Sequence, residues 1–169
     1  MTVTIEVPPR YARLVRKKAK ERNQSFEEYE DWDNQSDTWG VDPENRHMIG
    51  LMGEMAFAIY ADLQINTEVV GWSDEGVDFG VSIEGVERTV DIKTSQKEPY
   101  ALPVKKSRVN SDYYVLAHLE DTTVTFLGAA TKEMVLDRDP KKSKFGHYNY
   151  VVPVSALEPI PDSESIESV

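Results

Sequence analysis

The fold is decided by the stretch VDFGVSIEGVERTVDIKT, residues 77–94, which reads as two strands joined by a tight turn. Both halves are rich in β-branched residues, and Glu84-Gly85 suits a two-residue hairpin turn. Strands that pair around this turn place Phe79 opposite Val90, so that one face of the hairpin is apolar and the other is charged. The sequence therefore predicts a β-hairpin with two chemically different faces.

The charged face of this hairpin carries Asp78, Asp91 and Lys93. The same register places Asp78 opposite Asp91, and paired carboxylates have Cβ atoms roughly 5 Å apart and repel each other. At an effective dielectric constant of about 20 this repulsion is on the order of 3 kcal/mol. A divalent cation removes the cost, since Mg²⁺ prefers one or two carboxylates together with waters and phosphate oxygens. The hairpin therefore predicts half of a metal and phosphate site, and a solvated strand face on an acidic protein is the alternative.

Length and composition restrict the class of protein. A chain of 169 residues, 40% of them hydrophobic, suits one compact domain, which we expect over residues 1–160. There is no apolar run near 18 residues and no signal-peptide pattern, so a soluble cytoplasmic protein without a membrane partner is expected. The sequence contains no cysteine, which excludes disulfides, thiolate zinc sites and a cysteine nucleophile. Its three histidines form no close metal-binding pair, so a zinc enzyme is not expected.

The net charge of −11 is unevenly distributed. Residues 10–22 carry seven Lys and Arg and one Glu, and their apolar residues fall on one side, which predicts a basic amphipathic helix. Residues 27–44 carry eight acids and no Lys or Arg. This partition allows a basic docking surface on an acidic protein, although a solvated helix face is the more ordinary role. The overall acidity is also typical of proteins from a high-salt cytoplasm.

Two further helices are predicted before the hairpin. Ser25 followed by Glu28 is a capping-box pattern, which extends an N-terminal helical part over about residues 8–40. The third helix is expected from Pro43 to about Leu63 and is apolar on most sides, so it should lie in the core.

Glu54 lies in the middle of this apolar helix, where an unpaired buried carboxylate would be costly. Gly50 and Gly53 lie beside it, and glycines that each cost about 1 kcal/mol in a helix indicate that another segment approaches closely. His47 lies seven residues earlier, near the same stripe. We expect Glu54 to point towards the hairpin as a third carboxylate, and a salt bridge at the edge of the core is the alternative.

The rest of the chain predicts strands, one short helix and a disordered end. Strands are expected at residues 2–7, 67–72, 112–119, 123–127 and 148–154, and a short helix at 131–136. The polar segment 94–111 reads as a connection with room for a short helix at 104–110. The tail 161–169 is acidic and rich in serine, so we expect it to be disordered.

The charged motifs occur in the order Gly53-Glu54, Val77-Asp78 and Asp91-Ile92-Lys93, which resembles the PD-(D/E)XK nuclease superfamily. The order helix, three strands, connection, strand is also similar to that family's core, over about residues 43–119. The resemblance implies an α/β fold with a restriction-endonuclease-like core at about 43–155, in which helices flank a mixed central sheet of about five strands. The N-terminal helices would be additions to that core. Val77 stands where the family nominally has proline.

The resemblance also implies a role for each matching residue. Asp78 and Asp91 would bind Mg²⁺ or Mn²⁺, and Glu54 would complete the metal site or hold it through a water. Lys93 would orient the attacking water and stabilise charge on the phosphate. Gln96 lies where some members of the family carry a glutamine. The candidate substrate contacts are His47, Gln96, Lys105, Lys106 and Arg108.

These roles imply a deoxyribonuclease that hydrolyses phosphodiester bonds with a metal-activated water and contacts the DNA backbone. The acidity supports a different class as the alternative: a catalytically inactive nuclease-like protein, or a mimic of DNA, that binds protein partners. RNA or branched DNA would use the same site. The sequence leaves open endonuclease or exonuclease action, a homodimer or another oligomeric state, and a role in repair, restriction or viral genome processing.

Overall fold

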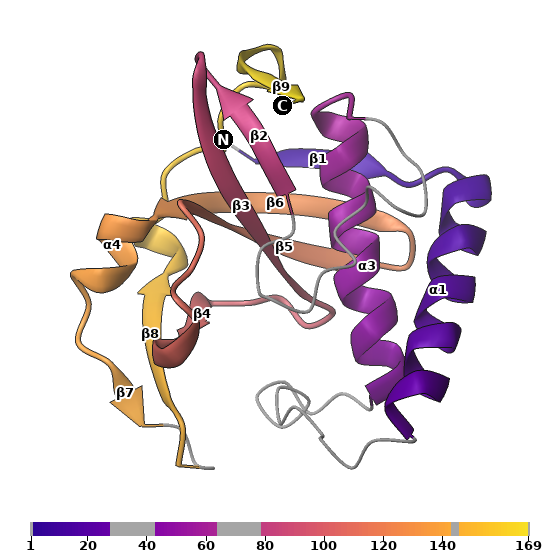
Figure 1. Ribbon diagram of the computed structural model, residues 1–169, viewed down its shortest axis with the longest axis horizontal. Coiled ribbons are helices and arrows are strands. Elements are labelled where there is room, and N and C mark those ends of the chain that lie inside the picture. Colours follow the sequence, from indigo (N-terminus) through magenta and orange to yellow (C-terminus); the bar gives the residue numbers. More distant parts are fainter. Residues whose placement is uncertain (1, 28–42, 64–78, 143–145, 169) are drawn as a thin grey trace.

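A computed structural model of the chain describes residues 2–27, 43–63, 79–142 and 146–168. These residues form a mixed six-stranded sheet with two long helices on one face and a three-stranded sheet against the other (Figure 1). The protein is therefore of the α/β class, as predicted. Within the residues that the structure describes, no helix is long and apolar enough to span a membrane.

The six-stranded sheet has the order β1-β6-β5-β3-β2-β9. Its strands are β1 (Val3–Glu6), β2 (Phe79–Ile83), β3 (Val86–Ser95), β5 (Tyr113–Glu120), β6 (Thr123–Thr131) and β9 (Ile166–Ser168). Only β3 and β5 run parallel; the other neighbours in this sheet are antiparallel. A parallel pair needs a crossover connection. The crossover here contains β4 (Ala101–Lys105), which the sequence did not predict, and a 3-10 helix (Lys106–Arg108) in place of the short helix.

The predicted hairpin is confirmed in its predicted register. Phe79 pairs with Val90, and Glu84 and Gly85 form the turn between β2 and β3. Both turn residues have positive φ angles, 51° and 82°, as the tight turns favoured between antiparallel strands require. The charged face of β3 therefore has the composition that the sequence predicted.

The two long helices lie side by side on one face of the sheet (Figure 1). The apolar helix is confirmed as α3 (Pro43–Tyr60). The basic helix is α1 (Pro9–Glu27), which continues through Ser25, so the capping box predicted there is wrong. Serine inside a helix costs only a few tenths of a kcal/mol relative to alanine, which is too little to end it. The remainder of the predicted second helix lies outside the described residues, as does the strand predicted at 67–72.

The main core lies between these helices and the sheet and is centred on Phe57 of α3. The Phe57 ring lies 5.1 Å from that of Phe79 on β2 and 6.2 Å from that of Phe126 on β6, measured between centroids. Phe57 and Phe126 are each 1% exposed. The aromatic cluster thus fixes α3 against the central strands.

A second, smaller sheet has the order β4-β8-β7, where β7 is Lys141–Lys142 and β8 is Tyr148–Pro153. Its inner side packs Leu102, Val104 and Val152 against Tyr114 and Leu116 of β5. The predicted mixed central sheet of about five strands has six, and the second sheet that lies against it was not predicted.

The short helix predicted at 131–136 is confirmed as α4 (Lys132–Leu136), which follows β6 and has Thr131 as its N-cap. The hydroxyl of Thr131 accepts a hydrogen bond of 3.2 Å from the backbone N–H of Met134. This hydroxyl satisfies one of the backbone donors that a helix start leaves without an intrahelical partner.

The C-terminal tail is ordered up to Ser168, which contradicts the disorder predicted for 161–169. Ile166 pairs with Ile83 of β2 and is 4% exposed. The hydroxyl of Tyr60 donates a hydrogen bond of 2.8 Å to the carbonyl of Pro161. The tail is acidic overall, but the side chain of Ile166 is buried in the main core and holds β9 at the edge of the sheet.

Candidate metal and active site

Asp91 and Lys93 form an ion pair on β3. The Nζ of Lys93 lies 3.1 Å from the Oδ2 of Asp91, and the two side chains share a face because they are two residues apart on one strand. The Asp91 side chain is 6% exposed and that of Lys93 is 23% exposed. Burying two charges costs hydration that their attraction roughly repays, so stability alone gives little reason for such a pair.

The position of Asp91 opposite Tyr114 is set by hydrogen bonds where β3 and β5 come together. The Oδ2 of Asp112 accepts hydrogen bonds from the backbone N–H and the hydroxyl of Thr89, at 2.9 and 3.1 Å. The backbone N–H of Asp112 in turn donates to the Thr89 hydroxyl at 2.9 Å. This clamp fixes the parallel register, in which Asp91 pairs with Tyr114.

Tyr114 is fully buried beside the ion pair. Burial raises the pKa of its phenol above the ordinary value of 10.0, and the backbone N–H of Ser111, which donates to the phenol oxygen at 3.0 Å, opposes the rise. The charge of Asp91 adds to the rise and that of Lys93 reduces it. The ring therefore lies within electrostatic reach of both members of the pair.

We expect Tyr114→Phe to make stability less sensitive to alkaline pH. The fold favours the neutral phenol, so the wild type has this contribution below pH 10 and loses it as the pH rises through the raised pKa of the folded state. The variant has no phenol to ionise, so its stability does not fall in this way at alkaline pH. At pH 7 it is less stable than the wild type by about 1 kcal/mol, because the backbone N–H of Ser111 loses its acceptor. Denaturant unfolding from neutral to strongly alkaline pH measures both effects, and identical pH dependence in the two proteins would contradict the assignment.

Helix α3 brings Glu54 to β3 through a tight contact made by the preceding residue. A Cβ built at Gly53 would overlap the Oγ1 of Thr94 and lie 3.0 Å from the Thr94 Cβ, so the helix can approach here only because residue 53 is glycine. Glu54 is 7% exposed. The predicted close approach is thus confirmed at Gly53. It is wrong at Gly50, where a Cβ would meet nothing within 4 Å.

Glu54 and the ion pair approach from opposite faces of the sheet. Thr94 faces α3, so by strand alternation Asp91 and Lys93 face the side that the second sheet covers. In the described part of the chain, the pairing of β2 with β3 begins at Phe79 and Val90.

The other predicted site residues are spread over several elements. Asp78 lies outside the described residues. His47 lies on α3, about two turns before Glu54, and Gln96 follows β3, where its carbonyl lies 3.3 Å from the Nε2 of His118. The second sheet and its 3-10 helix carry the remaining three, which are Lys105, Lys106 and Arg108. Among the described residues, no group of three His, Cys, Asp or Glu is placed to hold a metal ion.

Sequence reasoning missed Tyr114 and Thr94, which contact the elements of the site from β5 and β3. Both look like ordinary core residues, and no local pattern marks them. The parallel register and the packing of α3 bring them to the site, and neither can be read from sequence spacing.

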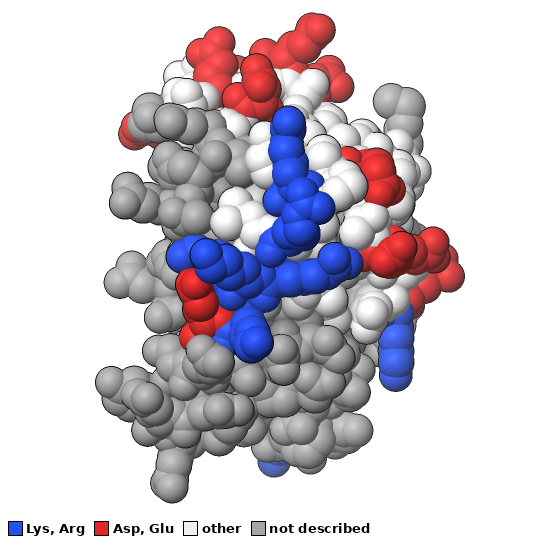
Figure 2. All heavy atoms as spheres, turned by 90° about the vertical axis from the view of Figure 1, so that its right-hand side faces the viewer, with Lys and Arg blue, Asp and Glu red and all other residues white. Residues whose placement is uncertain are grey.

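Lysine and arginine side chains gather over α1 on the face shown in Figure 2. The helix buries Ala12, Val15 and Ala19 against the core, which confirms the predicted basic amphipathic helix. Its exposed cations are Arg10, Arg13, Arg16, Lys17 and Lys20. All of them are directed to solvent, which is compatible both with a basic docking surface and with an ordinary solvated helix face.

Comparisons of the chain with protein-family models, with curated proteins and with solved structures find no match. The structure by itself defines an α/β protein whose mixed sheet carries an ion pair between the buried Asp91 and the partly exposed Lys93. A function must therefore follow from the chain's own residues.

Proposed function

We propose that this protein is a metal-dependent nuclease that hydrolyses DNA phosphodiester bonds with a metal-activated water. The observation that carries the proposal is the ion pair of buried Asp91 with Lys93, 3.1 Å apart on one strand, with a second buried carboxylate, Glu54, on the helix that touches that strand. Buried carboxylates are costly for a core unless a cation compensates them. A metal ion bound for catalysis at a phosphate would supply that compensating charge.

Each of these residues has a role in the proposed reaction. Asp91 would hold Mg²⁺ or Mn²⁺ through its carboxylate oxygens, which are the ligands that hard cations prefer, and Glu54, whose helix packs on the other face of the sheet, would hold the site through a water. Asp78, outside the described residues, is the further ligand that the sequence predicts. The bound cation supplies a water of lowered pKa and neutralises phosphate charge. Lys93 holds its ammonium in place by pairing with Asp91, so it can orient this water and stabilise the charge that develops on the phosphate.

The order of the elements also supports a restriction-endonuclease-like core. Helix α3, the β2–β3 hairpin, a crossover and a strand parallel to β3 follow one another, as the nuclease resemblance implies. The crossover departs from that pattern, because it contains β4 and a 3-10 helix.

Purified protein is expected to cleave plasmid or linear DNA in Mg²⁺ or Mn²⁺ and to leave both intact in EDTA. The assay should span a range of salt, because the net charge of −11 repels DNA most strongly at low ionic strength. Nicked circles would assign endonuclease action, and cleavage of linear DNA alone would assign exonuclease action. DNA left intact by both metals at every salt concentration would overturn the proposal.

The strong negative charge favours a second candidate, a non-catalytic protein that is nuclease-like or mimics DNA and binds a protein partner. An acidic surface complements a site that ordinarily takes DNA. Calorimetric titration with Mg²⁺ separates the candidates. A nuclease should lose metal binding on Asp91→Ala, whereas this second candidate has no such binding to lose. RNA or branched DNA cleaved in place of linear duplex would keep the same site and change its substrate.

A further inference from the structure

The second sheet carries positive charge without negative charge. Its strands and its 3-10 helix contain five of the 19 Lys and Arg of the chain and none of the 30 Asp and Glu. These five are Lys105, Lys106, Arg108, Lys141 and Lys142. In a chain with a net charge of −11, such a segregated surface is suited to a polyanion.

Two of these cations share the outer face of the sheet. Lys105 of β4 and Lys141 of β7 both pair with Asn149 of the central strand β8. Because Leu102 and Val104 face the core, this row faces outward. With strands about 4.8 Å apart, the two lysine backbones are separated by roughly 10 Å, with an amide between them.

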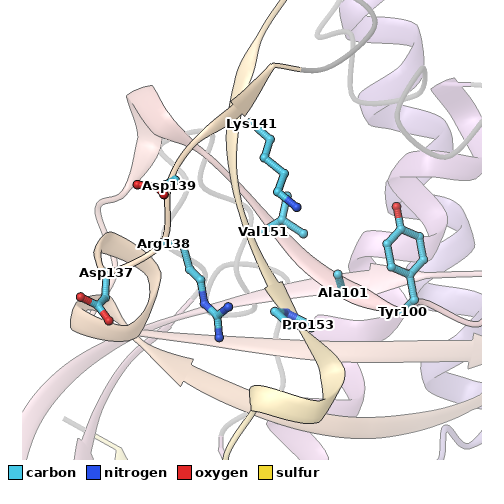
Figure 3. A pocket seen from close by; sticks show the side chains of 8 residues that line it. All are labelled: Tyr100, Ala101, Asp137, Arg138, Asp139, Lys141, Val151 and Pro153. Carbon is cyan, nitrogen blue, oxygen red and sulfur yellow. The ribbon is translucent and has the colours of Figure 1, made fainter.

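The same outer face is hollowed beside this row (Figure 3). The hollow has a volume of about 520 Å³. Its apolar floor consists of Ala101, Val151 and Pro153. Tyr100 stands at one side and is 86% exposed, which leaves a flat aromatic ring open to a ligand.

The basic and acidic side chains around the hollow point in different directions. Figure 3 shows the guanidinium of Arg138 and the ammonium of Lys141 on the side towards β8. The carboxylates of Asp137 and Asp139 lie on the far side of their segment. The hollow thus presents an aromatic ring, an apolar floor and two cations, and the two aspartates that also line it direct their carboxylates away from β8.

A second aromatic–cation pair lies on the same sheet, at the end of β8 and, by strand alternation from Asn149, on the opposite face. Tyr148 is 50% exposed, and the Nζ of Lys106 lies 5.8 Å from the centroid of its ring. Aromatic rings that stack on bases, combined with cations that contact the backbone, are the two parts of surfaces that bind single-stranded nucleic acid. Duplex DNA keeps its bases stacked on one another, so it cannot use an exposed tyrosine in this way.

We propose that the outer face of the second sheet binds a single strand of DNA. One base stacks on Tyr100 above the apolar floor, while Lys105, Arg138 and Lys141 contact the flanking phosphates. The inference rests on the proposed function and deepens it, because it names single-stranded DNA as the substrate class. The surface and the ion pair lie on consecutive strands, since only residues 96–100 separate β3 from β4.

Fluorescence anisotropy with a labelled oligothymidylate of about 15 nucleotides tests this surface in EDTA, where no cleavage occurs. We expect the single strand to bind more tightly than a duplex of equal length. Tyr100→Ala should weaken single-strand binding about tenfold, and Tyr100→Phe should keep wild-type affinity, since phenylalanine retains the stacking face. Tyr100 is exposed, so neither substitution disturbs the core.

Salt dependence separates the phosphate contacts from stacking. Lys141→Ala should reduce the slope of log Kd against log salt by about 0.7, the value of one single-strand phosphate contact. Tyr100→Ala should leave the slope unchanged. Arg88→Ala, which removes an exposed cation from β3 near the hairpin turn, is the matched control and should change neither affinity nor slope.

Three results would each overturn this inference: wild-type affinity in Tyr100→Ala, equal affinity for duplex and single strand, or equal losses from Arg88→Ala and Lys141→Ala. The proposed nuclease activity is decided separately, by cleavage in Mg²⁺ or Mn²⁺. Binding that depends on Tyr100, without any cleavage, would support the single-strand surface and reject the nuclease proposal. Cleavage without binding that depends on Tyr100 would support the nuclease proposal and reject the surface.

Discussion

Asp91→Asn is expected to abolish metal-dependent DNA cleavage, lowering its rate by at least about 10²- to 10³-fold, the usual loss when one preorganised electrostatic group is removed. An amide is a poorer ligand for a hard cation than a carboxylate. The change also removes the anion that holds Lys93 at 3.1 Å. Asparagine has nearly the same shape as aspartate, so the fold should persist. Initial rates of plasmid cleavage in Mg²⁺ and in Mn²⁺ measure the effect.

Asp121→Asn is the matched control for this substitution. Asp121 is exposed in the turn between β5 and β6 and has a φ of 57°, a conformation that asparagine tolerates well. Its replacement should leave cleavage unchanged. Glu54→Gln should cost less than Asp91→Asn, because Glu54 lies on the helix that packs on the opposite face of the sheet from the ion pair. Full activity in Asp91→Asn would remove Asp91 from the reaction.

Gly53→Ala is expected to destabilise the protein by about 1–2 kcal/mol, although alanine favours a helix by about 1 kcal/mol over glycine. The added Cβ would overlap Thr94 Oγ1 and lie 3.0 and 3.2 Å from the Cβ and Cγ2 of Thr94, so rotation of the threonine gives no relief. The helix must therefore move away from β3 and carry Glu54 with it. Denaturant unfolding measures the stability, and cleavage by the same variant should fall as well.

Gly50→Ala provides a control within the same helix. A Cβ at Gly50 meets nothing within 4 Å, so this change should stabilise the protein by up to about 1 kcal/mol. Adding Thr94→Ala to Gly53→Ala should recover part of the loss, because it removes the hydroxyl that the new Cβ overlaps. That hydroxyl is buried and has no hydrogen-bond partner among the described residues. Equal stability of the two glycine variants would contradict the close packing.

Local features of the site could be predicted because they depend on neighbours in sequence. The turn at Glu84-Gly85 fixes the register of the hairpin, and alternation along β3 then places Asp91 and Lys93 on one face. Helical periodicity likewise gave the apolar α3 and the basic α1. Each of these predictions involves residues within a few positions of one another, where backbone geometry leaves few choices.

The partners of these elements could not be predicted, because they lie far along the chain. The parallel pairing of β3 with β5 placed Tyr114 beside Asp91, across 23 residues. Burial of Ile166 ordered a tail whose composition indicated disorder. The hollow at Tyr100 also joins segments from separate elements. Such contacts depend on how all the apolar surfaces of the molecule are buried together, and a short segment of sequence does not carry this information.

The sequence by itself determined that one strand carries Asp91 and Lys93 on its charged face and that an apolar helix carries Glu54. Only the tertiary structure decided that this helix packs on the opposite face, at Gly53 and Thr94, and that a second sheet covers the charged side. The physical reason is that alternation along a strand separates two faces without specifying what covers each. That choice is made by the packing of all the apolar surfaces together.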